Sequence, residues 1–174
     1  TCLKKFQNSE MIAAVQGYAP TQNEEINACY YIRGADCWGW GTWKDRWMNF
    51  ETNGEKLLKQ IQAKRLKQAF NLNETYPFYQ MLERNVLGLN DSWAIRWHAS
   101  NFLQNKLSIY PPLSLVDNNG MDGTGTHSSI TEKYSVRIQK IDKSMLEFGE
   151  IKEDRLIIKQ LCKQNRRRFR YYPR

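Results

Sequence analysis

Residues 33–47, RGADCWGWGTWKDRW, decide much of the fold that we expect for this chain. Four of the six tryptophans lie in this stretch, and Gly34, Gly39 and Gly41 interrupt them. Glycine allows positive φ angles and close approach of the backbone to a ligand. Tryptophan offers a large apolar face and one N–H donor, which suits stacking on sugars or bases. We therefore expect a turn that leads into an aromatic core helix, a loop that shapes a ligand pocket, or both.

The second half of this stretch predicts a helix that begins at Thr42, whose hydroxyl is a typical N-cap. Trp43 and Trp47 would then share one helix face, because they are four residues apart. If the stretch serves both purposes, these two indoles pack inward while Trp38 and Trp40 line a pocket.

Alternating and helical patterns outside this stretch predict a mixed α/β fold with many helices and short strands. Strands are expected at 11–16, 28–32 and 107–110. Helices are expected at 1–7, 54–65, 77–87 and 90–103, and either Asn90 or Asp91 would cap the last of them. Residues 114–117 predict a further short strand, residues 134–138 fit either a strand or an extended arm, and residues 118–129 predict a loop. Residues 142–164 predict an amphipathic helix, or a helical hairpin broken near Gly149.

The composition favours anionic partners. Lys and Arg number 26 and Asp and Glu 18, which leaves a formal charge of +8. Nucleotide phosphates, nucleic acid and an acidic membrane face all fit this balance. Residues 164–174 hold five arginines and no acid, and we expect this tail to be dispensable for folding and to attract a membrane or a partner. The four cysteines show no paired spacing, so free thiols in a reducing compartment are expected.

Three residues are candidates for chemistry. Asp91 is either a helix cap or a general base held at a helix start, where the helix dipole favours the ionised form. His98 is expected to be structural, because it lies in the middle of a helix beside Trp97. His127 lies in a glycine-rich loop, where it could meet a phosphate or a metal.

Several motifs together resemble one family. Residues 33–40 (RGADCWGW), 42–44 (TWK), 90–97 (NDSWAIRW) and 122–127 (DGTGTH) are similar, in order and spacing, to bacterial family 2-type glycosyltransferases of surface-polysaccharide gene clusters. The resemblance covers about residues 8–128. It implies the GT-A fold, a nucleotide-sugar donor, a saccharide or lipid-linked acceptor, and Mg²⁺ or Mn²⁺ in the complete enzyme.

The resemblance also implies roles for particular residues. Asp91 would be the catalytic base. The diphosphate lid would include Gly125, Thr126 and His127, and His127 is the candidate metal ligand. The residues that would line the sugar pocket are Arg33, Gly34, Ala35, Asp36, Trp38, Gly39, Trp40 and Arg96.

One departure from the family pattern limits what this chain is expected to do. The family carries an acidic Asp-x-Asp metal motif, and this sequence contains none. We therefore expect residues 1–130 to be the acceptor-side part of a GT-A domain, residues 131–174 to be a helical, basic extension, and the chain alone to show little transfer activity. The expected location is the cytoplasm, with peripheral contact at the inner membrane.

Two other functions remain open from the sequence. One is a non-catalytic carbohydrate-binding remnant. The other is a basic nucleic-acid-binding module that combines the arginine tail with tryptophan stacking. Nucleic acid is the weaker alternative, because the tryptophans lie far from the arginines in the sequence.

Overall fold

A four-stranded mixed sheet forms the centre of the computed structural model, which describes residues 2–21, 25–117, 135–136, 138 and 146–168. The strand order is β2-β4-β1-β3. The strands are β1 (Ile12–Gln16), β2 (Tyr30–Arg33), β3 (Trp40–Gly41) and β4 (Leu107–Tyr110). Strands β1 and β4 are parallel, whereas β2 and β3 pair antiparallel to them on either side. The chain is therefore mixed α/β, as the sequence predicts.

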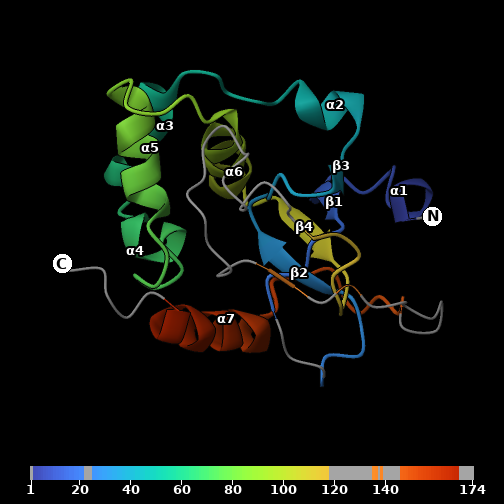
Figure 1. The fold of residues 1–174 in the computed structure, drawn as a ribbon. Coiled ribbons are helices and arrows are strands. Elements are labelled where there is room, and N and C mark those ends of the chain that lie inside the picture. The colour runs from blue at the N-terminus through green and yellow to red at the C-terminus, as the bar shows by residue number, and fades with distance from the viewer. Residues whose placement is uncertain (1, 22–24, 118–134, 137, 139–145, 169–174) are drawn as a thin grey trace.

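Seven helices surround this sheet in the described part of the chain (Figure 1). They are α1 (Cys2–Lys5), α2 (Lys44–Trp47), α3 (Gly54–Ala63), α4 (Lys67–Phe70), α5 (Phe78–Val86), α6 (Trp93–Leu103) and α7 (Arg155–Arg168). Helices α3, α4 and α5 gather beside α6, and α7 lies separately below β2 in this view. None of these helices combines the length and the apolar composition that crossing a lipid bilayer requires.

Helices α3 to α6 share one apolar core because each places its hydrophobic residues on a single stripe. The members of this core are Leu57, Ile61, Phe70, Tyr79, Leu82, Ile95, Ala99 and Phe102. Asn53 caps α3, since its side chain accepts the Lys56 N–H, and Ser92 caps α6 in the same way through the Ile95 N–H. The predicted helices at 54–65, 77–87 and 90–103 are thus confirmed, and Ser92 rather than Asn90 or Asp91 is the cap.

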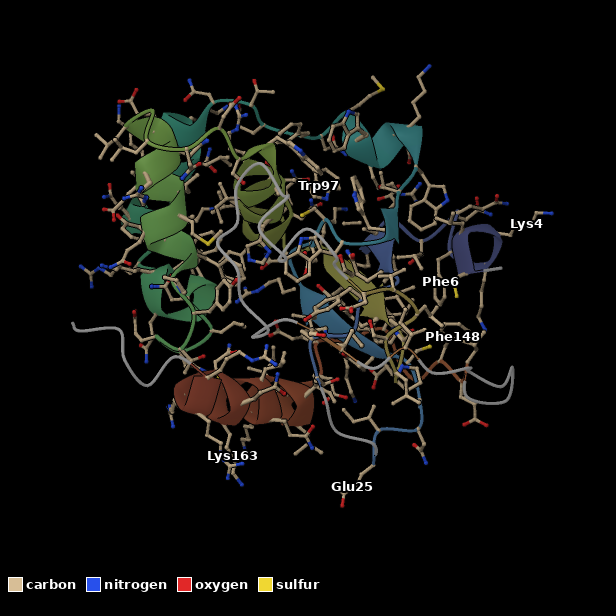
Figure 2. All side chains as sticks on the ribbon, viewed as in Figure 1. Lys4, Phe6, Glu25, Trp97, Phe148 and Lys163 are labelled. Atoms are coloured by element: carbon tan, nitrogen blue, oxygen red, sulfur yellow. The ribbon has the colours of Figure 1, made fainter. Side chains whose placement is uncertain are left out.

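The two faces of the sheet differ because successive side chains of a strand point to opposite sides. One face, which we call the apolar face, carries Ile12, Tyr31, Leu107 and Ile109. Phe6 and Phe148 meet edge to face, with ring centroids 5.1 Å apart, and pack in this same cluster (Figure 2). The other face, which we call the polar face, carries the buried residues Ala14, Gln16, Ser108 and Tyr110.

The helix predicted from Thr42 begins later and packs differently. Trp43 occupies the N-cap of α2, and the Thr42 hydroxyl donates instead to the Ala13 carbonyl at 2.6 Å. The two indoles do not share a face. Trp43 donates its N–H to the Leu3 carbonyl and packs with the apolar-face cluster, whereas Trp47 contacts Trp40 and Trp97. A helix of only four residues cannot fix both orientations, so tertiary contacts decide them.

The C-terminal region departs most from the sequence-based expectations. Residues 146–154 are not helical: Phe148 forms a parallel bridge with Cys29, and the helix begins only at Arg155. Residues 114–117 form no strand, and nor do the described residues 135, 136 and 138. The helix continues to Arg168 with Asn165 buried, so the predicted helix end near Gln164 is wrong. That the residues after Gln164 are dispensable for folding stays a prediction.

The predicted division at residue 130 falls outside the described residues and stays a prediction. Helix α7 of the predicted extension packs against the sheet, where Ile157 and Leu161 lie on Tyr30 and Tyr110. The sequence did not predict β3 or α4, both of which are too short to give a periodic pattern.

Candidate functional site

The connection from β2 to β3, residues 34–39, crosses the polar face of the sheet. The Ser108 hydroxyl donates to the Gly34 carbonyl at 2.7 Å, and the Gln16 amide donates to the Asp36 carbonyl at 3.3 Å. At the far end of the connection, the Gly17 N–H donates to the Gly39 carbonyl at 2.6 Å. These bonds carry the segment from beside Ser108 within β4 to the carboxyl end of β1, the edge where ligands usually bind in open α/β sheets.

Gly34 and His98 fix where this connection begins. Gly34 has φ +94°, and a Cβ at this position would lie 2.5 Å from His98 Cε1. His98 Nδ1 lies 3.1 Å from the Ala35 carbonyl, so the neutral ring donates there. Burial, together with the positive charge of Arg33, lowers the pKa of His98 to about 4 against the partial compensation of the Ala35 bond. His98 is therefore a neutral packing residue, stacked on Phe78 with ring centroids 4.2 Å apart.

Five side chains converge at the carboxyl ends of β1 and β4, and we call them the strand-end cluster. Its members are Gln16, Tyr30, Asp36, Cys37 and Tyr110. The Tyr30 and Tyr110 rings stack in parallel with centroids 5.5 Å apart. The Tyr30 hydroxyl lies 2.9 Å from the Thr21 hydroxyl. Sequence analysis missed the tyrosines and Gln16, because their shared position depends on strand pairing.

Burial dominates the protonation of this cluster. Desolvation raises the pKa of Asp36, although its Oδ1 accepts the Cys37 N–H at 2.6 Å and backbone hydrogen bonds oppose the shift. Desolvation and then the Asp36 charge raise the pKa of the Cys37 thiol to about 12. The pKa of Tyr110 is raised by burial and then by Asp36. The thiol and the phenol therefore stay neutral at pH 7 and can act as hydrogen-bond donors.

Gln16 gives the cluster an unused acceptor. Its Oε1 is buried and has no hydrogen-bond partner among the described residues. A buried amide oxygen without a partner costs roughly 1–3 kcal/mol, so such an atom needs an explanation. A bound polar group or an ordered water at this strand end would satisfy it.

An aromatic surface lies beside the strand-end cluster, and we call it the tryptophan shelf. Trp40 pairs with Gln16 in the sheet, so the two features are neighbours. The Trp40 ring lies 5.8 Å from Trp47, 5.7 Å from Trp93 and 5.8 Å from Trp97, centroid to centroid. Trp97 is fully buried between α6 and the sheet (Figure 2), whereas Trp47 and Trp93 are 40% and 39% exposed. The shelf thus has a rigid inner wall and an open aromatic edge.

The structure brings some predicted site residues together. Trp40 contacts the start of α6, and the exposed Asp91 stands two residues before Trp93. Trp38 turns the other way and meets Tyr18 edge to face at 4.8 Å. Since Ser92 is the N-cap, the helix-cap interpretation of Asp91 is wrong.

The two predicted substrate arginines lie elsewhere. Arg33 pairs with Leu107 at the opposite end of the sheet, and its guanidinium lies 4.0 Å over the Phe102 ring and donates to Asn105 at 3.1 Å. Arg96 donates to the Thr52 carbonyl at 3.0 Å. Two further side chains of this region bind the same 49–53 segment, since Ser100 accepts the Glu51 N–H and Gln104 donates to the Asn49 carbonyl. Both arginine side chains therefore make contacts that hold the fold together, and their predicted place in the pocket lining stays a prediction.

The predicted lid residues Gly125, Thr126 and His127 lie outside the described residues. Within the described part of the chain, no three His, Cys, Asp or Glu side chains gather as a metal-ligand set. Asp36 and Cys37 provide two groups, and a thiol with a pKa near 12 stays protonated and is a poor ligand. The described residues thus do not form a site that fits the expected Mg²⁺ or Mn²⁺.

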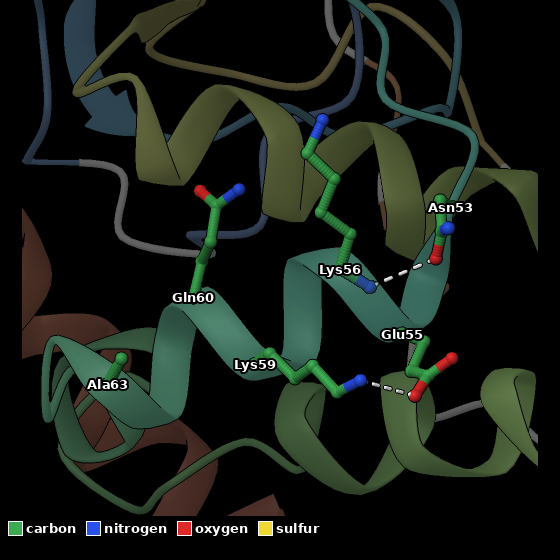
Figure 3. Close-up of a pocket in the computed structure, with 6 residues that line it drawn as sticks. All are labelled: Asn53, Glu55, Lys56, Lys59, Gln60 and Ala63. Carbon is green, nitrogen blue, oxygen red and sulfur yellow. Dashed lines mark hydrogen bonds and ion pairs between the residues drawn. The ribbon is translucent and has the colours of Figure 1, made fainter.

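An open hollow on α3 lies away from this chemistry (Figure 3). Two of its lining lysines are engaged in ion pairs, Lys56 with Glu51 at 2.5 Å and Lys59 with Glu55 at 2.6 Å. Glu55 lines the hollow as well and is held in its ion pair with Lys59, and the remaining lining residues, Asn53, Gln60 and Ala63, carry no ionisable group.

Comparison with known proteins found no family model, no curated protein and no solved structure that matches this chain.

Proposed function

We propose that this chain is the acceptor-side part of a GT-A glycosyltransferase that moves a sugar from a nucleotide sugar to a saccharide or lipid-linked acceptor. One observation carries the proposal. The 33–40 and 90–97 stretches, which are separate in the sequence, meet where Trp40 contacts Trp93 and Trp97. An exposed aromatic edge suits a sugar, because indoles stack on the apolar face of a pyranose. The exposed Asp91, whose carboxylate could accept a sugar hydroxyl, lies two residues before Trp93 in the chain.

The tryptophan shelf would hold the acceptor saccharide against Trp47 and Trp93, with the Asp91 carboxylate at its rim. Asp91 would take the proton from the acceptor hydroxyl as the hydroxyl oxygen bonds to the anomeric carbon of the donor. The bond from that carbon to the nucleoside diphosphate breaks in the same step, and the diphosphate leaves. Exposure suits Asp91 to this role, because a base must reach the acceptor hydroxyl whose proton it takes.

Asp36 would play a different part in the same site. Its carboxyl is inside the strand-end cluster, where burial raises its pKa. Together with the unpartnered Gln16 Oε1, it would bind sugar hydroxyls rather than remove a proton. Asp36 would thus be a binding carboxylate, and Asp91 would be the catalytic base.

Saccharide binding tests the shelf. Saturation-transfer NMR with a panel of neutral oligosaccharides should detect binding, and Trp93→Ala should weaken it about tenfold, which corresponds to roughly 1.4 kcal/mol of binding free energy. Trp43→Ala is the matched control, since Trp43 packs on the other sheet face and donates to Leu3. Equal loss in both variants, or no binding by the wild type, would contradict the proposal.

Turnover in the complete enzyme tests Asp91. Asp91→Asn keeps the size of the side chain and removes the proton acceptor, so transfer from the nucleotide sugar should fall about 10²–10⁴-fold. Thermal unfolding should be unchanged even for Asp91→Ala, because Ser92 supplies the cap. Wild-type turnover of Asp91→Asn at saturating acceptor would show that another group is the base. Saccharide binding without any transfer would favour the non-catalytic carbohydrate-binding alternative.

A further inference from the structure

Helix α7 carries an unbalanced charge. Its fourteen residues include Arg155, Lys159, Lys163 and the run Arg166–Arg168, and they include no acid. The acids that precede the helix have other partners. Asp154 Oδ1 accepts the backbone N–H groups of Leu156 and Ile157, and Glu153 accepts the Arg33 N–H.

Packing fixes which side of α7 faces outward. Ile157 and Leu161 lie against Tyr30 and Tyr110, and the Cys162 thiol donates to the Leu72 carbonyl at 3.1 Å. Asn165, one turn further along the inner face, is also buried. The helix therefore cannot rotate to hide its charge without breaking these contacts.

The basic side chains gather on the opposite, exposed side. Arg155, Lys159, Lys163 and Arg166 follow one another at spacings of three and four residues, so they share one stripe. All four are exposed, and Lys163 points away from the rest of the molecule in Figure 2. Leu156 lies beside this stripe and is 70% exposed.

We propose that this outward face of α7 docks on an anionic lipid bilayer. A row of cations attracts acidic headgroups, and an exposed leucine at the same level enters the boundary between headgroups and acyl chains. A nucleic-acid strand is the poorer match, because single strands bind through aromatic stacking as well as charge. Among the described residues the exposed tryptophans Trp47 and Trp93 lie on α2 and α6, not on α7. The docking face is independent of the proposed transferase activity.

Vesicle co-sedimentation tests this surface. The full chain should bind vesicles of phosphatidylcholine with 30% phosphatidylglycerol and should not bind phosphatidylcholine alone. Each Lys or Arg near an acidic bilayer contributes roughly fivefold in affinity, so Arg155→Gln, Lys159→Gln and Lys163→Gln combined should weaken binding about a hundredfold. Raising the salt from 0.1 M to 1 M should release the wild type, because the screening length falls from about 10 Å to about 3 Å.

A charge-matched control distinguishes α7 from overall charge. Lys44→Gln, Lys59→Gln and Lys64→Gln combined remove three exposed cations from α2, α3 and the end of α3, and this variant should bind within about threefold of the wild type. Leu156→Ser should weaken binding severalfold at unchanged charge. Circular dichroism checks that each variant is folded, and the salt and lipid dependence of the wild type tests the proposal without any variant.

Three results would overturn the proposal. They are equal binding to neutral vesicles, equal loss in the two triple variants, and α7-dependent binding of single-stranded RNA with no binding to anionic vesicles.

Discussion

The two faces of the central sheet differ in the side chains that they bury. The same strands present Ile12, Leu107 and Ile109 on one side and Ala14, Ser108 and Gln16 on the other. Phe6 and Phe148 cover the apolar face and leave no polar side chain without a partner in that cluster among the described residues. The polar face is covered by the 34–39 connection, which leaves Gln16 Oε1 unsatisfied and Asp36 partly desolvated.

The two faces therefore contribute differently to the stability of the fold and to the position of the candidate site. A strand face that buries large apolar side chains gains stability in proportion to the area removed from water. The polar face also buries apolar area, because Tyr30 and Tyr110 pack against α7, but its small residues Ala14 and Ser108 let the 34–39 segment and α6 approach closely. Both faces therefore stabilise the fold, and the polar face also positions the candidate site.

The largest expected effect is on the apolar face. Ile109 is 1% exposed and packs at the centre of its cluster, so Ile109→Ala should lower the free energy of unfolding by about 2–5 kcal/mol. Urea denaturation followed by circular dichroism measures the change. A loss below about 1 kcal/mol would show that the apolar face is not the main support of the sheet.

We expect the free energy of unfolding to depend on pH through His98, which packs against Gly34 and Ala35 at the start of the 34–39 connection. The folded-state pKa of His98 is depressed to about 4 from 6.5, so the unfolded chain binds the proton more tightly. The contribution of the neutral ring is thus complete above pH 6.5 and is lost as the pH falls toward 4, by up to about 3 kcal/mol. The free energy of unfolding, measured between pH 4 and 7, should rise with pH. His98→Gln should remove the part of this rise that corresponds to one bound proton. An unchanged slope would mean that another group titrates.

A smaller effect is expected from the backbone of the connection. Gly34→Ala adds a methyl group that meets the His98 ring and strains a φ of +94°, so it should cost roughly 1–3 kcal/mol. Gly88→Ala is the matched control, since Gly88 also has positive φ but nothing lies within 4 Å of the added Cβ. The difference between the two variants in thermal unfolding measures the His98 contact. Equal losses would reduce Gly34 to a turn glycine with no packing role.

The sequence alone determined the elements that have a periodic pattern. Alternating or helical apolar spacing predicts six elements, because an element that buries one face carries its apolar residues at that spacing. These elements are the strands at 12–16, 30–33 and 107–110 and the helices α3, α5 and α6.

Only the tertiary structure decided where the side chains of the site went. Trp43 and Trp47 have the same chemistry and adjacent helical turns, yet they pack on different clusters, because β3 and α1 offer each a different partner. Ser92 became the cap in place of Asp91, and Arg33 and Arg96 became supports of the fold. Gln16, Asp36 and Tyr110 meet because β1 and β4 are parallel neighbours and a distant connection crosses their ends. Such contacts depend on which strands pair, and local residue patterns do not predict that pairing.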